Sequence, residues 1–521
     1  MSNLPPFKNE PQTDFKNPDN VAAFQQAIDL VRSQLGRKYP LHIGGEQVSP
    51  GEVFVSLNPA RPSEIIGTFA KGRKEDAEHA IEAAAAAFET WRSVALEQRA
   101  RFLLKAAHEM RRRKHEFSAW MVFEIGKSWA EADADTAEAV DFLEYYARQM
   151  MRLSNASEML TNYPGEEAEL EYIPLGVGAV IPPWNFPNAI MTGMTSAAIV
   201  AGNCVVLKPS SITPTIAYKF CELLWQSGLP AGVLNFLPGP GGAIGDTIVD
   251  HPKTRFIAFT GSKEVGMRIF ERASKVQPGQ KWLKRTVLEM GGKDAVVVDE
   301  TADLEAAAEG IVTSAFGFQG QKCSAGSRAI IVDKVYDTVA ERVVDRTRQL
   351  QQGAPDVGPQ IHQGPVSDKN SMETIMDYIE VGTQEGKLLL GGDALTTPEG
   401  GYYIKPTIFG DVDGNARIAQ EEIFGPVLAM IRAKDFSQAI DIANSTEFGL
   451  TGSLYSRDRA RLEEARQRFH VGNLYFNRKS TGALVGVHPF GGFNMSGTDS
   501  KAGGPDYLLL FTQAKSIAEK L

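Results

Sequence analysis

One cysteine of the chain, Cys323, lies in an unusual setting. It belongs to the stretch FQGQKCSAGSR (Phe318–Arg328), among glycines, amides and small polar residues, whereas a structural cysteine normally sits in an apolar run. Cys204, in a predicted buried strand, and Cys221, in a predicted helix, fit that ordinary pattern. The setting of Cys323 favours a thiol that a substrate can reach, which is a candidate nucleophile. Lys322 would lower its pKa if the lysine side chain turned toward the sulfur.

Two other polar residues are candidates for chemistry on a substrate. Glu289, in VLEMGGKD, could act as a general base or form a structural ion pair. Asn185 lies in PPWNFP, whose prolines hold the backbone, so its amide could stabilise an oxyanion or simply belong to a rigid turn. A thiol hydrolase would also need a histidine base. None of the eight histidines lies close to Cys323 in the sequence.

Junctions between predicted strands and helices indicate where phosphate could bind. GPGGAIG, with Gly241 and Gly245, follows a strand and opens a helix, where backbone amides could face an anion, although an ordinary turn explains it equally well. In FTGS, Ser262 could contact phosphate or cap a helix. Lys208 ends a buried strand on the side where open α/β sheets bind ligands, or is a surface lysine. Glu422, in QEEIFGPV, is either a ligand for sugar hydroxyls or an ordinary carboxylate.

The elements that must position these residues alternate between short strands and helices. Predicted strands cover Cys204–Lys208, Val233–Phe236, Arg255–Phe259, Asp294–Val298, Ala329–Val332 and Pro426–Ile431. Predicted helices cover Asn188–Ala201, Thr213–Ser227, Lys263–Ala273, Leu304–Phe318, Asp337–Leu350 and Phe436–Asn444. This alternation predicts right-handed crossovers and mainly parallel, doubly wound sheets, which is the α/β class.

The two ends of the chain follow other patterns. Before the alternating region, long helical patterns cover Lys74–Arg92, Glu97–Lys127 and Ala130–Leu153. After it, Tyr507–Ala518 has an extended pattern. A tail strand outside both cores is a candidate for pairing with another subunit.

Composition excludes several classes of protein. The 521 residues suffice for two or three domains, and a net charge of −10 disfavours nucleic acid and membrane surfaces as partners. The one basic run, Met110–Phe117, has the pattern of a solvated helix face. Three widely spaced cysteines suggest neither a disulfide framework nor a metal site. The N-terminus lacks the pattern of a signal peptide, and no apolar stretch approaches the roughly 20 residues that span a bilayer. We therefore expect a cytoplasmic protein.

Taken together, the motifs resemble the aldehyde dehydrogenase superfamily. IPPWNFP, VVLKPS, GPGGAIG, FTGS, LEMGGKD, GQKCSAGSR, EEIFGPV and PFGGFNMSG occur in the family's order, and Glu289 and Cys323 are 34 positions apart, as its pattern asks. The resemblance implies a Rossmann-like NAD-binding domain, an α/β catalytic domain and a small β oligomerisation flap. These would be residues 1–155 and 172–286, 287–480, and 156–171 with 500–521; residues 481–499 would form a substrate-anchoring segment.

The resemblance also implies roles for the candidate residues. Cys323 would attack an aldehyde, Asn185 and the Cys323 backbone N–H would stabilise the oxyanion, and Glu289 would activate the water that hydrolyses the thioester. NAD would contact Ile181, Pro183, Trp184, Lys208, Ser210, Ser211, Gly241, Gly245, Phe259, Thr260, Gly261, Ser262, Val265, Met290, Gly291, Glu422 and Phe424. Ser211 stands where NAD-preferring relatives often have a glutamate that repels NADP, so we expect NAD with NADP tolerated.

Longer stretches are similar to one branch of the superfamily, which oxidises L-glutamate γ-semialdehyde to L-glutamate in proline breakdown. They include YPLHIGGE, AVDFLEYYARQM and FHVGNLYFNRKSTGALVGVHPFGGFNMSGT. In that branch Ser324, Gly482 and Ala483 would hold the substrate's carboxylate and amine, while Phe186 and Phe490 would border its aliphatic part. We see no proline-oxidising domain beside these motifs, so a stand-alone enzyme is expected. The resemblance also implies a homodimer, with a trimer of dimers as the larger alternative.

Three other functions remain open from the residues alone. One is oxidation of a different short aldehyde or semialdehyde; Ser324, Gly482 and Ala483 separate the two, because an apolar substrate would have no use for them. Another is a cysteine hydrolase or acyltransferase, which needs a histidine and no dinucleotide. The third is a binding protein with a dead site, which the intact Cys323, Asn185 and Glu289 disfavour.

Overall fold

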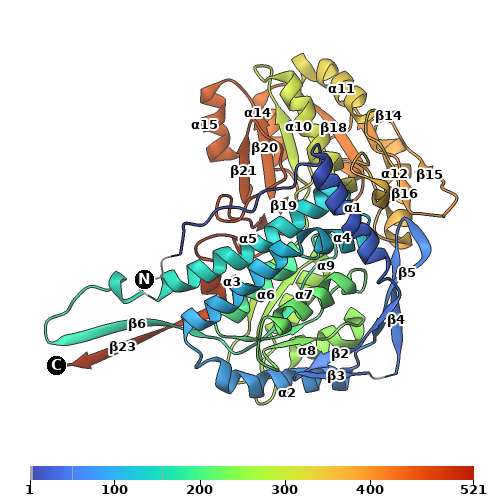
Figure 1. Ribbon diagram of the computed structural model, residues 1–521. Helices are drawn as coiled ribbons and strands as arrows, with labels where there is room; N and C mark the ends of the chain where they lie inside the picture. Colours follow the sequence, from blue (N-terminus) through green and yellow to red (C-terminus); the bar gives the residue numbers. More distant parts are fainter. Residues whose placement is uncertain (1–3, 50, 155) are drawn as a thin grey trace.

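The computed structural model describes residues 4–49, 51–154 and 156–521, and two seven-stranded sheets occupy separate halves of the molecule (Figure 1). In spatial order, the first sheet consists of β11 (Arg285–Glu289), β10 (Thr254–Thr260), β7 (Val177–Ile181), β8 (Cys204–Leu207), β9 (Leu234–Phe236), β2 (Leu41–Ile43) and β3 (Glu46–Val48). Its first five strands are parallel, and β2 and β3 are antiparallel additions at one edge.

The second sheet follows the same principle. Its order is β14 (Lys387–Leu390), β17 (Thr407–Gly410), β18 (Val427–Ala433), β13 (Arg328–Val332), β12 (Ala295–Val298), β20 (Thr451–Tyr455) and β21 (Asn473–Phe476). Only β14, at one edge, is antiparallel to its neighbour. Strands β12, β13, β17 and β20 are buried along their whole length. Helices cover both faces of such a sheet, which is why these strands read as continuous apolar runs.

Helices pack around each sheet. In the first half they are α1 (Pro18–Arg32), α2 (Lys74–Trp91), α3 (Leu96–Arg112), α4 (Lys114–Ile125), α5 (Trp129–Leu153), α6 (Ala189–Val200), α7 (Pro214–Gln226), α8 (Asp246–Asp250) and α9 (Lys263–Ala273). In the second half they are α10 (Leu304–Phe316), α11 (Asp333–Thr347), α12 (Lys369–Glu385), α13 (Arg417–Gln420), α14 (Phe436–Ala443) and α15 (Arg459–Arg468). This architecture confirms the predicted α/β class, while the residue boundaries of the domains remain a prediction.

Smaller β elements complete the fold. A three-stranded sheet joins β1 (Arg37–Tyr39), β5 (Arg61–Ala70) and β4 (Val53–Asn58), and short pairs join β15 (Ala394–Leu395) to β16 (Tyr403–Ile404) and β19 (Phe448–Gly449) to β22 (Phe493–Asn494). Strands β6 (Glu166–Pro174) and β23 (Thr512–Lys520) form an antiparallel arm that extends away from the body of the molecule (Figure 1). No helix in the described ranges is long and apolar enough to cross a membrane.

The prediction of one helix over Glu97–Lys127 is wrong. The structure has two helices, α3 and α4, because Arg113 leaves the helical conformation, with φ −105° and ψ 21°. Gly126, with φ +69°, then ends α4. The break lets α3 pack along α5, while α4 lies buried on almost all sides.

Two other predicted elements have different bounds in the structure. The helix predicted to reach Phe318 stops at Phe316, because Phe318 and Gln319 adopt positive φ angles of 49° and 55°. The tail predicted as extended from Tyr507 begins with a 3₁₀ turn over Tyr507–Phe511 and becomes a strand only at Thr512. Three apolar side chains of that turn are buried, so packing against the core overrides the extended pattern.

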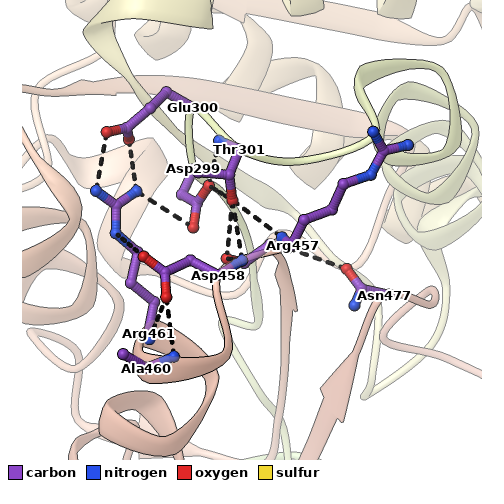
Figure 2. A network of polar contacts seen from close by, with 9 residues as sticks. Asp299, Glu300, Thr301, Arg457, Asp458, Ala460, Arg461 and Asn477 are labelled. Atoms are coloured by element: carbon purple, nitrogen blue, oxygen red, sulfur yellow. Dashed lines mark hydrogen bonds and ion pairs between the residues drawn. The ribbon is translucent and has the colours of Figure 1, made fainter.

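A polar network closes the carboxyl ends of β12 and β20 (Figure 2). Arg461, at the start of α15, forms a forked pair with Glu300 at 2.7 and 2.8 Å and lies 3.4 Å from Oδ2 of the buried Asp299. The Thr301 hydroxyl donates to Asp299 and accepts the backbone N–H of Asp458. Ligands usually bind at this edge of an open α/β sheet, but here side chains of the protein occupy it.

Replacing Arg461 by Met should destabilise the fold by about 3 kcal/mol, because the buried Asp299 carboxylate loses its cation. A lower urea midpoint with an unchanged slope would show this. Arg459→Met is the matched control, since Arg459 on the same helix pairs with Glu463 alone in the described part of the chain and is largely exposed. Equal midpoints for the two variants would contradict the proposed importance of the network.

Candidate active site

A cavity of about 380 Å³ brings many of the predicted residues together. It is lined by Phe186, Phe259, Thr260, Glu289, Cys323, Ser324, Gly482, Ala483 and Phe490, among others. The candidate nucleophile, the candidate base and the whole predicted substrate set therefore share one space. Within the described residues, no cluster of His, Cys, Asp and Glu could hold a metal ion.

A strained turn presents the thiol to this cavity. Phe318, Gln319 and Gly320 follow one another in the left-handed region, and for the first two this conformation costs about 1–2 kcal/mol each. A Cβ atom at Gly320 would lie 2.2 Å from the carbonyl oxygen of Gly425, so only glycine fits there. The Ser367 N–H donates to the side chain of Gln321 at 2.9 Å and fixes the far side of the turn.

The surroundings of the thiol disfavour its ionisation. Burial raises the pKa of Cys323 above its ordinary value, and the carboxylates of Asp294, Glu422 and Glu289 raise it further. Lys322 does not offset this effect, because its ammonium group binds both oxygens of Glu131, at 2.7 and 2.8 Å. The Lys322 side chain therefore does not turn toward the sulfur, as it would have to do to lower the pKa of the thiol. A base must take the thiol proton instead.

Glu289 has the properties of such a base. Its Oε1 atom accepts hydrogen bonds from the hydroxyl and the backbone N–H of Ser500, at 2.5 and 3.3 Å. Its Oε2 atom is buried and has no hydrogen-bond partner in the described part of the chain. Burial raises the pKa of Glu289 to about 8, despite the opposing hydrogen bonds from Ser500. The carboxyl group can therefore exchange a proton near neutral pH.

Hydrogen-bond donors are available close to the sulfur. The Asn185 amide donates to the carbonyl of Gln321 at 3.0 Å, which uses one of its two N–H donors and ties it to the thiol loop. The backbone N–H of Cys323 has no acceptor among residues 4–49, 51–154 and 156–521. Unpaired donors beside a nucleophile can stabilise negative charge on a substrate oxygen.

The predicted anchor residues present similar donors. The backbone N–H groups of Gly482 and Ala483 donate to no acceptor in the described structure and border the same cavity as Cys323. The carbonyl of Ser324 accepts a hydrogen bond from the Ser480 hydroxyl at 3.1 Å, which holds the serine beside this segment. Free amides and a hydroxyl can bind a carboxylate without an arginine in the cavity.

The predicted cofactor residues gather outside the carboxyl ends of the first sheet. Ile181, Thr260 and Glu289 end β7, β10 and β11, and Lys208 directly follows β8. Pro183 and Trp184 follow β7, and the Trp184 ring meets Phe424 edge-on at 5.3 Å. The remaining predicted residues lie in the loops and helix starts after these strands, namely Ser210, Ser211, Gly241, Gly245, Gly261, Ser262, Val265, Met290 and Gly291.

Details of this surface fit a dinucleotide. A Cβ atom at Gly241 or Gly245 would meet nothing within 4 Å, so the backbone of that loop is open to a ligand. Burial lowers the pKa of Lys208 to about 8, and among the described residues its ammonium group donates only to the neighbouring Pro209 carbonyl, at 3.2 Å. An anion would stabilise the charged form of such a lysine.

Glu422 and Ser262 have structural roles as well. Glu422 accepts the backbone N–H of Gly292 at 3.1 Å, and a Cβ atom at Gly291 would lie 2.0 Å from its Oε2 atom. The Ser262 hydroxyl accepts the N–H of Val265 at 3.4 Å, which is the helix-capping alternative considered from the sequence. Capping at the first turn of α9 leaves other donors of that turn available.

Sequence reasoning missed the acidic face of α5. Glu131, Glu138 and Asp141 line the cavity together with Lys479 and His488. Burial and neighbouring carboxylates raise the pKa of Glu138 to about 8. The sequence could have indicated this face, because Glu131 and Glu138 are seven positions apart and residues with that spacing lie on one face of a helix.

The fold and this cavity are those of a family of NAD-linked enzymes. The sequence matches the model of the aldehyde dehydrogenase family over residues 47–517, and the chain belongs to that family. It is 60% identical over 514 residues, 99% of each chain, to 1-pyrroline-5-carboxylate dehydrogenase of Geobacillus kaustophilus (strain HTA426).

Solved structures agree. The chain is similar to 1-pyrroline-5-carboxylate dehydrogenase from Thermus with bound NAD, with a TM-score of 0.97, 52% identity and coverage of 100% of both chains. It is also similar to proline utilization A (PutA) from Bdellovibrio bacteriovorus, with a TM-score of 0.96 and 44% identity. That match covers 100% of this chain and 54% of the other.

The burial of the three free cysteines predicts their reactivity. Cys204 and Cys221 are buried and Cys323 is partly exposed, so a thiol reagent should modify one thiol per native chain and all three after denaturation. Counting thiols with Ellman's reagent, with and without denaturant, measures this. The reaction should accelerate with rising pH, because the thiol pKa is raised. Cys323→Ser should show no native reaction; any remaining reactive thiol would contradict the assignment.

Proposed function

We propose that this enzyme oxidises L-glutamate γ-semialdehyde, the open form of Δ1-pyrroline-5-carboxylate, to L-glutamate with NAD as the hydride acceptor. One observation carries the proposal. The nucleophilic Cys323 shares its cavity with the free N–H groups of Gly482 and Ala483, which suit the substrate's carboxylate. An apolar aldehyde would have no use for that anchor. The names of the relatives, at 60% and 52% identity, support the same substrate.

The first chemical step joins the sulfur to the aldehyde carbon. A base takes the thiol proton, Sγ bonds to the carbonyl carbon, and the carbonyl oxygen becomes an oxyanion. The second N–H of the Asn185 amide and the Cys323 backbone N–H are the donors for that oxygen. Glu289 is a proton acceptor in the cavity, since its Oε2 atom has no hydrogen-bond partner in the described chain.

The cofactor would lie along the strand ends of the first sheet, where Trp184, Lys208, Gly241 and Glu422 surround it. When bound, NAD supplies the acceptor for the hydride that leaves the thiohemiacetal and so produces the thioester. Ser211 carries no charge to repel a 2′-phosphate, so NADP should be tolerated beside NAD.

The last step returns the enzyme to its starting state. Glu289 first releases the thiol proton to solvent, then takes a proton from water, and the hydroxide adds to the thioester carbon. The C–S bond then breaks, and the sulfur leaves with the proton, releasing glutamate. Covalent catalysis of this kind divides one difficult oxidation into two easier reactions.

We further propose a cytoplasmic homodimer, with a trimer of dimers as the larger form. Strands β6 and β23 pair within the chain, so the tail strand that was predicted to pair with another subunit would do so as part of this two-stranded arm. The arm that they form extends from the body (Figure 1), and Met159 and Tyr163, in the segment that leads into β6, are both more than half exposed. An exposed arm with unpaired edges suits association with a second copy. The free cysteines fit a reducing compartment.

The function is tested by measuring NADH formation from Δ1-pyrroline-5-carboxylate and from a panel of simple aldehydes, each with NAD and with NADP. The expected result is a preference of at least about 100-fold in kcat/KM for the pyrroline substrate, about the discrimination that one or two well-placed polar contacts provide. Comparable activity on propanal would overturn the proposed substrate while leaving the family and the cysteine chemistry in place.

The role of Glu289 predicts a pH dependence. A base works only when ionised, and the pKa of Glu289 is about 8, so kcat should rise as the pH passes through that value and then level off. Glu289→Gln should remove this rise and reduce turnover by about 100-fold or more. If its attack step survives, the variant should still release one NADH per active site before stalling as a thioester. An unchanged pH profile in the variant would rule Glu289 out as the base.

A further inference from the structure

Arg478 lies behind the anchor turn, on the chain that leaves β21. Its Nη2 atom donates to two successive carbonyl oxygens, those of Thr481 at 2.8 Å and Gly482 at 2.9 Å. At the other end of the turn, the N–H of Leu484 donates to Nδ1 of His488 at 3.2 Å. The turn is thus held from both ends by side chains.

The two carbonyls belong to the peptide groups whose N–H donors form the anchor. The described chain has no cis peptide bonds, so within each peptide group the N–H points opposite to the C=O. The Thr481 carbonyl shares a peptide group with the Gly482 N–H, and the Gly482 carbonyl shares one with the Ala483 N–H. By holding both carbonyls, Arg478 turns both N–H groups away from itself. Gly482, at φ +79°, supplies the left-handed conformation that brings successive N–H groups to one side.

The positive charge of Arg478 can act on these two peptide groups, because no carboxylate neutralises it in the described structure. The guanidinium group stacks over the Tyr475 ring at 4.4 Å and forms no ion pair with any carboxylate of the described residues. A positive charge on the carbonyl side of a peptide polarises it and makes its N–H a stronger donor, because linked hydrogen bonds reinforce one another. The substrate's carboxylate would therefore feel a cation through two peptide groups, without an arginine occupying space in the cavity.

We propose that Arg478 is the positioning residue of the carboxylate anchor, orienting and polarising the Gly482 and Ala483 amides toward the substrate. This inference rests on the proposed function, since it explains how the same site recognises an amino-acid semialdehyde. It assigns specificity to a residue that does not border the cavity. Arginine suits the position because Nη2 reaches both carbonyls while the planar guanidinium group stacks on the Tyr475 ring.

The test compares Arg478→Met and Arg478→Lys with wild type and with Arg466→Met. Arg466 is a matched control, because it also stacks over an aromatic ring, that of Phe476 at 5.5 Å, but contacts no anchor peptide. For Arg478→Met, KM for Δ1-pyrroline-5-carboxylate should rise about tenfold or more, because charge-assisted hydrogen bonds are lost, while kcat changes little. The loss in kcat/KM for propanal should be much smaller. Arg478→Lys should give an intermediate KM, and Arg466→Met should match wild type.

A second measurement does not depend on the cofactor. Glutarate, a dicarboxylate without the reacting aldehyde, should protect Cys323 from alkylation by iodoacetamide in the wild-type enzyme. The concentration needed should rise about tenfold in Arg478→Met and stay unchanged in Arg466→Met. Protection unaffected by Arg478→Met, or equal losses on propanal and on the pyrroline substrate, would overturn the inference.

Failure of the inference can be told apart from failure of the proposed function. If wild type shows no preference for the pyrroline substrate over propanal, the proposed function itself fails, whatever the variants do. If wild type shows the preference and Arg478→Met keeps it, the function stands and the role of Arg478 is wrong. Should Arg478→Met fail to fold, Arg478→Lys carries the same test, because it retains the charge and the aliphatic stem.

Discussion

The cavity depends on one backbone constraint, the left-handed turn of Phe318, Gln319 and Gly320. The left-handed conformation is unfavourable for residues other than glycine, so contacts with the surrounding structure must stabilise it. The close approach of Gly320 to the Gly425 carbonyl, and the hydrogen bonds of Gln321 with Ser367 and Asn185, supply that restraint. The same contacts join the thiol loop to the loop that carries Glu422. Reactive sulfur and cofactor surface are therefore fixed by one set of interactions.

Burial gives the polar residues of the site their common character. Desolvation raises the pKa of Glu289 to about 8 and that of Glu422 to about 7, and it lowers that of Lys208 to about 8. Each of these groups is poised to change charge when a ligand or proton arrives, because no oppositely charged side chain forms a close ion pair with it in the described chain. A stable ion pair, such as that between Lys322 and Glu131, would have fixed the charge instead.

Much of the fold could be predicted because parallel strands and amphipathic helices carry strong periodic signals. The helix Lys263–Ala273 matches its prediction at both ends, and the ends of the six strands predicted in the alternating region differ from the observed ones by at most two residues. The break at Arg113 could not be predicted, since arginine is a good helix former and only packing turns the chain there. The early end of α10 could not be predicted for a similar reason. Phe318 adopts a strained backbone conformation that the active site requires, and residue type does not indicate this.

The residues of the site also divide into those that the sequence could predict and those that it could not. Residues recognisable by type and spacing, such as Cys323 and Glu289, were predictable and do share a cavity. The direction of the Lys322 side chain was not, because it depends on Glu131, nearly two hundred positions away. The proposed role of Arg478 was the hardest to predict from the sequence. Arg478 acts on the orientation of peptide groups, and residue type does not indicate that orientation.

The polar network in Figure 2 has a practical consequence for the second sheet. Its strands are mainly parallel, and Cys323 precedes the start of β13, whereas the network closes the opposite edge, where β12 and β20 end. None of the network residues borders the cavity. The exposed side chains around it, such as Arg457 and Arg459, therefore offer points for attaching a dye or a solid support. A label fixed there would report on the enzyme without obstructing the path of its substrate.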